Sequence, residues 1–404
     1  MEDKYYLYHK TKQICFFTLD KQDITSCIIN KANINYLPIP LKRILHNKDE
    51  FVSIENDKSI ILNDEGLILL DCWLSDREIP VNRDNYNKYI KKNNNALLWM
   101  LENYAYSLID CYWINNENNT INYDEILLLK DNIDNYISVI TNDNHYYKGI
   151  NSTLGGQLEK FWYKSNGRVK LCKKVEKPFD VINAREVIAS LIYTKQGFRN
   201  FCNYEFVKDK VDEVIGCKCF AFTNENNELI TAYDLLEEYN LTQQDNVYEL
   251  IPKLAAKLGA DKTEVEKQMD LESIVDFLIL NRDRHQGNIG FLRNSNTLKI
   301  QSTAPIYDSG SCKHLEGVYP EDLLNTTING LYNTEQELLS HIRDFSVLDV
   351  SKLPSIEEIK SIYDECIYLS EKRKQKLLGY YEERIKFIKN KQLEQSYSDY
   401  DITL

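Results

Sequence analysis

The feature that constrains this chain most is an apolar stretch that runs directly into a polar one. Residues 271–280 are mostly apolar and predict a buried helix, and residues 281–290 follow with the sequence NRDRHQGNIG. A core helix that ends in such a segment presents polar side chains at the edge of the core. Asp283 and Asn288, five residues apart, can then face one cleft.

The spacing of these two side chains matches that of kinase catalytic loops, Asp-x-x-x-x-Asn. In such loops the carboxylate holds the acceptor hydroxyl and takes its proton, and the amide oxygen reaches a Mg²⁺ ion bound to the phosphates of ATP. We therefore predict Asp283 as the catalytic base and Asn288 as a metal ligand. For His285, in the same loop, we favour a structural role, hydrogen-bonding the loop backbone.

A second acidic element follows twenty residues after Asn288. Asp308-Ser309-Gly310 has the form of the kinase Asp-Phe-Gly element, in which the Asp binds Mg²⁺. Residues 289–300 predict a hairpin, which would return the chain and place Asp308 beside Asn288. Each element alone is commonly a plain turn. Their order, and the hairpin between them, favour a shared metal site.

A small β-rich region precedes these elements. Residues 161–165 and 168–174 read as strands, and Asn166-Gly167 between them is a strong hairpin signal. Just upstream, the sequence STLGGQLEK begins at residue 152. Gly155 and Gly156 let a backbone approach phosphate oxygens closely, so the loop through Gln157 is predicted to contact ATP.

A kinase also needs a strand Lys to contact the phosphates and a helix Glu to orient it. Val169, Leu171 and Lys173 share one face by period-two alternation, which favours Lys173 for this role. The following helix, predicted over 183–196, supplies Glu186 as its partner. Gly197 is placed to end that helix.

The chain divides into a small strand-rich lobe with one helix and a larger helical lobe, preceded by a separate unit. We predict an N-terminal accessory domain over 1–135, an N-lobe over 136–228, a C-lobe over 229–395 and a flexible tail over 396–404. Helices are expected at 66–74, 96–108, 247–258 and 371–390, and strands at 14–19 and 216–223.

The charge and composition of the chain argue against several classes of function. The net charge of -13 disfavours sequence-independent nucleic-acid binding. No signal peptide and no bilayer-spanning run is expected, so we predict a cytoplasmic protein without membrane contact. Cys217 and Cys219 would share a strand face, but further zinc ligands are not evident nearby, and buried reduced thiols are the preferred interpretation.

At this point the chain resembles the HipA-like serine/threonine kinases, a bacterial group that includes toxin kinases. The resemblance rests on the Asp283 and Asp308 elements, together with Ala304-Pro305-x-Tyr307, the 152–160 loop, Leu171-Cys172-Lys173 and the Glu186 helix. It implies a bilobal protein-kinase-like α+β fold, preceded by a small N-terminal α/β unit. It further implies ATP and Mg²⁺ as cofactors.

The resemblance also implies regulation and partners. A Ser in the family's Gly-rich loop can be autophosphorylated, and Ser152 occupies the matching position, with Thr153 beside it. Family toxins act on translation proteins, often aminoacyl-tRNA synthetases, and are restrained by a helix-turn-helix antitoxin. Two alternatives stay open: a phosphatidylinositol-type lipid kinase, which uses a similar pair of elements, and a non-catalytic ATP-binding regulatory module.

Overall fold

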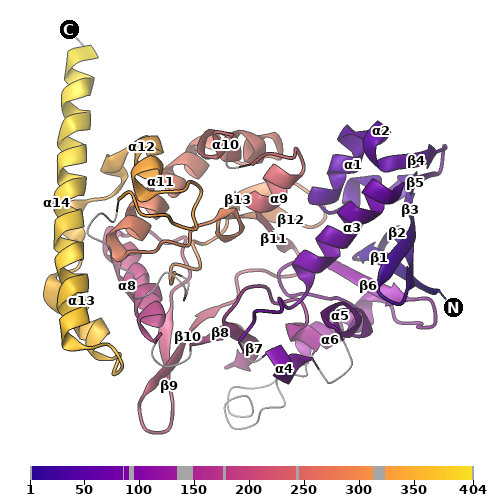
Figure 1. The fold of residues 1–404 in the computed structure, drawn as a ribbon, viewed down its shortest axis with the longest axis horizontal. Helices are drawn as coiled ribbons and strands as arrows, with labels where there is room; N and C mark the ends of the chain where they lie inside the picture. The colour runs from indigo at the N-terminus through magenta and orange to yellow at the C-terminus, as the bar shows by residue number, and fades with distance from the viewer. Residues whose placement is uncertain are drawn as a thin grey trace.

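The computed structural model describes residues 2–84, 86–90, 95–133, 149–175, 179–242, 245–311, 313 and 324–402. Over these residues the protein is a mixture of helices and antiparallel sheets. The N-terminal strands lie at one end of the molecule and the long C-terminal helix α14 at the other, with the remaining elements between them (Figure 1).

The N-terminal unit is built on a six-stranded antiparallel sheet with the order β4-β5-β3-β2-β1-β6. Its strands are β1 (Asp3–His9), β2 (Lys12–Asp20), β3 (Asp23–Asn30), β4 (Val52–Glu55), β5 (Ser59–Leu62) and β6 (Tyr112–Asn116). The predicted strand over 14–19 is the centre of β2. Strand β6 returns from far along the chain to pair with β1, so Ile114 lies opposite Leu7 in the core.

Helices accompany this sheet: α1 (Arg43–His46), α2 (Lys48–Phe51), α3 (Asp64–Arg77), α4 (Tyr86–Tyr89), α5 (Ala96–Glu102) and α6 (Tyr123–Asp131). Helix α3 covers the stretch predicted as 66–74. Helix α5 is shorter than the predicted 96–108, because Tyr104 and Ala105 adopt left-handed backbone angles (φ 60° and 47°) that no α-helix continues through.

The next unit is a four-stranded sheet, β7-β8-β10-β9, with one long helix. Its elements are β7 (Glu159–Ser165), β8 (Arg168–Lys174), α8 (Val181–Gln196), β9 (Glu205–Lys208) and β10 (Val214–Phe220). Asn166 and Gly167 both have positive φ (51° and 74°), as a two-residue turn matching the strand twist requires. Gly197 ends α8 in the left-handed conformation, as predicted.

The third unit is mainly helical and contains a small sheet, β11-β12-β13. Its elements are β11 (Asn227–Thr231), α9 (Ala232–Glu237), α10 (Val247–Lys257), α11 (Lys262–Ile279), β12 (Gly290–Asn294), β13 (Ile300–Thr303), α12 (Glu335–His341), α13 (Ile356–Asp364) and α14 (Glu371–Ile402). Helix α11 starts nine residues before the predicted apolar stretch, because Asp261 caps it through the Glu264 N–H group.

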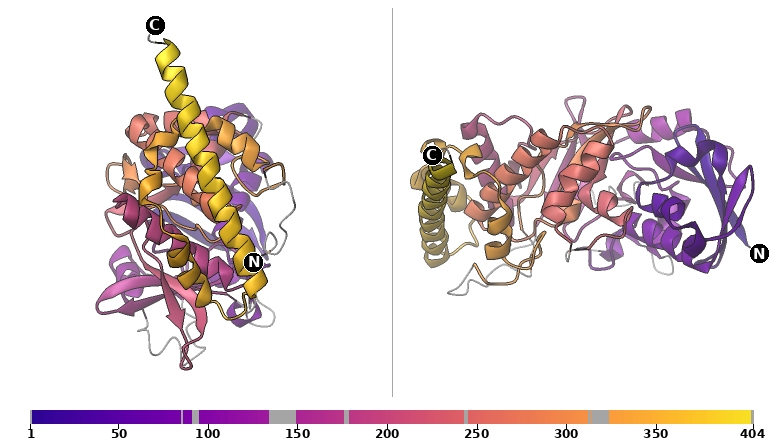
Figure 2. Two further views of the ribbon diagram at one scale, coloured as in Figure 1. Left: turned by 90° about the vertical axis from the view of Figure 1, so that its left-hand side faces the viewer. Right: turned by 90° about the horizontal axis from the view of Figure 1, so that it is seen from above.

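Helix α14 corrects the prediction of a flexible tail over 396–404. It continues as helix to Ile402, and its C-terminal end extends beyond the body of the molecule (Figure 2). Near its centre Tyr381 and Ile388 are buried against the helical core that α8 and α11 share. The predicted helix over 371–390 is therefore only part of a longer one, in which Gln392 and Gln395 still hydrogen-bond to the backbone of residues 343–348.

The N-terminal unit packs against both of the following units. A cluster of buried apolar side chains joins Trp113 and Ile126 of the first unit to Leu154 and Trp162 of the second. The predicted boundary at 135 lies outside the described residues. The predicted boundary at 228 falls inside β11, which pairs with β12, so this strand belongs with the third unit. Among the described residues, no helix is both long and apolar enough to cross a membrane.

Candidate active site

One cavity, of about 1010 Å³, brings the predicted site residues together. It is lined by Asp283, Asn288 and Asp308 from the third unit, and by Lys173 from β8. The loop before β7 contributes Gly155, Gly156 and Gln157. Residues more than a hundred positions apart in the sequence therefore face a common space. The cavity also reaches the N-terminal unit, where Trp73, Arg77 and Tyr112 form its wall.

Lys173 lies at the centre of a buried charge network. Its Nζ is 2.6 Å from Glu186 Oε1 on α8 and 2.9 Å from Asp308 Oδ1. Lys173 and Glu186 are both almost fully buried. Burial lowers the pKa of Lys173, but the two carboxylates outweigh it and hold that pKa above its ordinary value. The other oxygen of Glu186 accepts a hydrogen bond from the Ser309 N–H group.

Asp308 is held as a carboxylate by two lysines. Besides Lys173, Lys160 of β7 places its Nζ 3.7 Å from Asp308 Oδ2. Burial raises the pKa of Asp308, but the two ammonium groups outweigh it and hold that pKa well below its ordinary value. Asp308 also has a left-handed backbone (φ 57°), which is costly for a residue with a side chain. Strained backbone and a fixed charge of this kind often occur at functional sites.

The catalytic-loop pair has the arrangement that the spacing predicts. Asn288 donates its side-chain amide to the backbone oxygen of Asp283 at 3.0 Å, which leaves its own amide oxygen available as a ligand. Asp283 receives a hydrogen bond from the Asn329 side-chain amide on one carboxylate oxygen. The Asn329 N–H group also donates to Arg282 O at 2.9 Å, so the loop around Asn329 is fastened to the catalytic loop.

Arg284 joins the Asp283–Asn288 loop to the Asp308 element. Its guanidinium makes a two-pronged contact with Asp276 of α11, with Nε 2.6 Å from one carboxylate oxygen and Nη2 3.1 Å from the other. It also donates to Asn288 O, to Tyr307 O and to Ser309 Oγ. One buried cation thus holds the ends of both elements. Such multiple donation needs the flat guanidinium fork.

Glu272 also lies 2.9 Å from the Arg284 guanidinium, but its role differs from that of Asp276. Burial raises the pKa of Glu272 to about 8, even though Arg284 lowers it. At neutral pH Glu272 is therefore largely protonated, and Asp276 is the counter-ion of Arg284. The double hydrogen bond to Asp276 supports this assignment.

His285 fits the structural role predicted for it. Its Nδ1 accepts a hydrogen bond from the Gly287 N–H group at 3.1 Å, which shapes the loop between Asp283 and Asn288. Burial lowers the pKa of His285, which favours the neutral ring that this acceptor role needs. The Tyr307 hydroxyl adds a hydrogen bond to Gly287 O at 2.8 Å.

The loop over the cavity depends on Gly156. This residue has φ 87°, and a Cβ atom there would lie only 2.8 Å from Lys160 Nζ. Gly155, by contrast, would meet nothing within 4 Å. The absence of a side chain at Gly156 therefore lets Lys160 reach beneath the loop toward Asp308.

The two candidate phosphorylation sites are buried in this conformation. Ser152 is fully buried, and within the part of the chain that the structure describes its hydroxyl has no hydrogen-bond partner. The Thr153 hydroxyl donates to Tyr106 O of the N-terminal unit at 3.2 Å. Phosphorylation of either residue would require the loop to leave its position.

The residues present suit a magnesium–nucleotide complex. Asn288 and Asp308 offer uncharged and charged oxygen ligands, the type that Mg²⁺ prefers. Lys173 and Lys160 place one ammonium group at each carboxylate oxygen of Asp308, where they can face phosphate oxygens. Cys219 lines the cavity too, while Cys217 is buried nearby; both are free thiols, as preferred from the sequence.

Comparison with known proteins yields a structural neighbour. The fold is similar to that of CtkA, a proinflammatory kinase from Helicobacter pylori. The similarity covers 60% of this chain and 94% of that chain, at 21% sequence identity and a TM-score of 0.47. No protein-family model matches the sequence, and no curated protein matches it either. The roles assigned to the site residues therefore rest on the geometry of this site.

Three residues at the site were not predicted from the sequence. Arg284 directly follows Asp283 in the polar segment, and this position is the signal that could have identified it. Lys160 lies near the start of β7, and nothing in the local sequence shows that its side chain reaches Asp308. Asn329 lies far downstream, and no sequence pattern marks it.

Proposed function

We propose that this chain is a Mg²⁺- and ATP-dependent phosphotransferase, and that it acts as a serine/threonine protein kinase of HipA type. The observation that carries the proposal is the convergence of Lys173, Asp283, Asn288 and Asp308 on one cavity. The Lys173–Glu186 pair at 2.6 Å supplies the orientation that a phosphate-binding lysine needs. A non-catalytic module would have no need for Asp283 and its support by Asn329.

The residues can divide the work of phosphoryl transfer among them. Asp283, which Asn329 holds through one carboxylate oxygen, would accept the proton of the acceptor hydroxyl. Asn288 and Asp308 would hold Mg²⁺, which neutralises charge on the transferred phosphoryl group when bound. Lys173 would contact phosphate oxygens, and the Gly155–Gln157 loop would cover them and exclude water.

Transfer of label from [γ-³²P]ATP to a generic protein substrate, and to the chain itself, tests the proposal. We expect Asp283→Asn to lower kcat by about 10²- to 10⁴-fold, the contribution of a positioned base. Asp308→Asn should abolish Mg²⁺-dependent turnover with little change in thermal unfolding. The matched control is Asp261→Asn, because Asp261 caps α11 outside the site. Normal turnover by Asp308→Asn would refute the metal assignment.

The acceptor class and the autophosphorylation are finer parts of the proposal. Phosphoamino-acid analysis of labelled host lysate should give phosphoserine and phosphothreonine, and phosphoproteomics against Asp283→Asn should name a target, with translation proteins the expected class. Label transferred to phosphatidylinositol vesicles and not to protein would favour a lipid kinase. Mass spectrometry after ATP incubation tests Ser152 and Thr153. A helix-turn-helix partner, if co-purified, would support the toxin–antitoxin role.

A further inference from the structure

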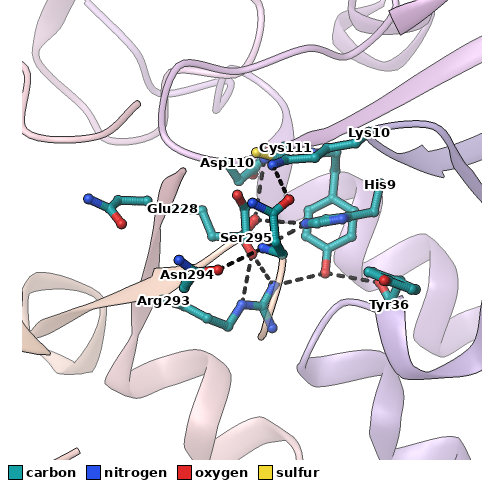
Figure 3. Close-up of polar contacts among 12 residues, drawn as sticks. His9, Lys10, Tyr36, Asp110, Cys111, Glu228, Arg293, Asn294 and Ser295 are labelled. Carbon is teal, nitrogen blue, oxygen red and sulfur yellow. Dashed lines mark hydrogen bonds and ion pairs between the residues drawn. The ribbon is translucent and has the colours of Figure 1, made fainter. Parts of the chain in front are cut away.

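A second group of potential ligands lies where the N-terminal unit meets the third unit. His9 ends β1, Cys111 precedes β6, and Glu228 lies in β11. One ligand atom from each of these side chains lies within 4.8 Å of the other two. All three side chains are at most 1% exposed. The side chains point toward one another across the junction (Figure 3).

We propose that His9, Cys111 and Glu228 form a zinc-binding site that joins the N-terminal unit to β11. Imidazole nitrogen, thiolate sulfur and carboxylate oxygen are the three ligand types that zinc uses in proteins. His9 and Glu228 lie in paired strands, and Cys111 directly precedes the paired strand β6, so sheet pairing fixes the position of all three. This site does not depend on the proposed kinase activity.

The carboxylate of Glu228 is already oriented for such a role. Arg293 donates its Nε to Oε1 at 2.8 Å, and the Arg293 guanidinium also contacts the Tyr112 hydroxyl at 3.2 Å. The other oxygen, Oε2, lies 3.2 Å from His9 Nε2. It also accepts a hydrogen bond from the Cys111 N–H group at 3.4 Å. Arg293 thus holds Oε1 and leaves Oε2 facing His9 and Cys111. Residues that hydrogen-bond to metal-bound carboxylates orient them in the same way.

The histidine can present the required nitrogen. Its Nε2 faces Glu228 at 3.2–3.3 Å, whereas its Nδ1 is buried and has no hydrogen-bond partner among the described residues. The ring proton can therefore move to Nδ1 without displacing another donor. Nε2 would then be free to bind a metal ion in place of its contact with the carboxylate.

Cys111 supplies a free, buried thiol, and its Sγ contacts Glu225 O at 3.7 Å. Zinc binding would replace the thiol proton with a Zn–S bond and release that proton to solvent. Because Glu228 lines the large cavity, water from that cavity can complete four-coordination.

The charge balance sets the expected affinity. One thiolate and one carboxylate offset the two charges of zinc, and the charge of Arg293 remains. We therefore expect weaker binding than at zinc sites with four protein ligands. Metal binding should still resist dialysis against buffer, because three ligands are held in place before the metal arrives.

The full-length chain is stripped with a chelator, incubated with excess Zn²⁺, desalted and analysed for metal by mass spectrometry. We expect about one equivalent of zinc in the wild type and little in Cys111→Ser, as ligand loss predicts. Cys72→Ser is the control, because Cys72 is an exposed free thiol. Co²⁺ in place of Zn²⁺ should give a thiolate-to-metal absorption band that Cys111→Ser abolishes and Cys72→Ser retains.

Two results would overturn the zinc site. One is wild-type protein that retains no more zinc than Cys111→Ser. The other is a Co²⁺ spectrum without the thiolate band in the wild type, a measurement that requires no variant to fold. Either result would leave His9, Glu228 and Arg293 as a hydrogen-bonded junction only. Because the readouts are metal content and absorption, they stand whether or not the chain transfers phosphate.

Discussion

Replacing Arg284 by lysine tests whether one guanidinium holds the catalytic loop to the Asp308 element. A lysine can keep one ion pair with Asp276, but it cannot also reach Asn288 O, Tyr307 O and Ser309 Oγ, which Arg284 contacts now. Breaking a buried charge network of this kind typically costs about 3–5 kcal/mol. Since small proteins have ~5–15 kcal/mol of total stability, we expect Arg284→Lys to fold but to unfold at lower urea concentration.

The same substitution should lower activity, because both metal-binding elements lose their anchor. A displacement of about 1 Å in a reacting group costs roughly 10²-fold in rate, so we expect kcat to fall by about that factor. Arg384→Lys is the matched control. Arg384 is similarly buried and pairs with both oxygens of Glu335 at 3.0 and 2.6 Å, but its contacts go to α12 and to Phe277 O of α11 rather than to the Asp283 loop or the Asp308 element.

Urea unfolding followed by circular dichroism, and phosphate transfer at saturating ATP, are measured on both variants. Arg384→Lys should lose stability with kcat within a few-fold of the wild type. The reasoning fails if Arg284→Lys keeps wild-type kcat, or if both variants lose kcat to the same degree. In the latter case general loosening of the fold, and not the anchor, would explain the loss.

Three further substitutions probe the site. Gly156→Ala adds a Cβ 2.8 Å from Lys160 Nζ at a φ of 87°, so the KM for ATP should rise about tenfold in a kinetic titration. Glu272→Gln tests a pH effect on stability. Burial raises the pKa of Glu272 from 4.5 to about 8 in the folded protein, so the free energy of unfolding of the wild type should fall as pH rises through that window, by up to ~1.4 kcal/mol per pH unit. Urea unfolding at several pH values should show a smaller slope for the variant. Asn329→Ala removes the hydrogen bond that Asn329 donates to Asp283, and kcat should fall about tenfold at unchanged KM for ATP.

Each of these expectations has a result that contradicts it. Gly155→Ala serves as the control for the loop, since its Cβ meets nothing, and equal effects at both glycines would count against the Lys160 argument. A pH slope that persists in Glu272→Gln would assign it to other carboxyl groups. A shifted KM for ATP in Asn329→Ala, with kcat intact, would place Asn329 in nucleotide binding.

Local sequence patterns predicted the parts of the fold that local forces determine. The Asn166-Gly167 turn, the end of α8 at Gly197 and the hairpin of β12 and β13 each depend on a few neighbouring residues. The pairing of Lys173 with Glu186 followed from strand alternation and helix phase, two short-range periodicities. These features need no knowledge of the rest of the chain.

Long-range features could not be read in the same way. Strand β6 pairs with β1 across about a hundred residues, and nothing in Tyr112–Asn116 alone names its partner. Asn329 reaches Asp283 from a loop 46 residues downstream for the same reason. The helix predicted over 371–390 stops short of the end of α14 because residues 391–397 include no buried apolar side chain that would continue the pattern. Short-range periodicity cannot predict contacts that depend on tertiary packing.

Hydrogen bonds from the N-terminal unit to the loop over the cavity affect the site that the second and third units form. The Asp84 N–H group donates to Gln157 O at 2.8 Å, Arg83 donates to Leu154 O, and Thr153 donates to Tyr106 O. At a net ~1 kcal/mol each, such bonds together hold the Gly-rich loop down by ~3 kcal/mol, or roughly a hundredfold in population. Any opening of the loop, whether to admit a nucleotide or to expose the Ser152 and Thr153 hydroxyls, must therefore break these hydrogen bonds. The N-terminal unit thus contributes to the free energy of opening the site.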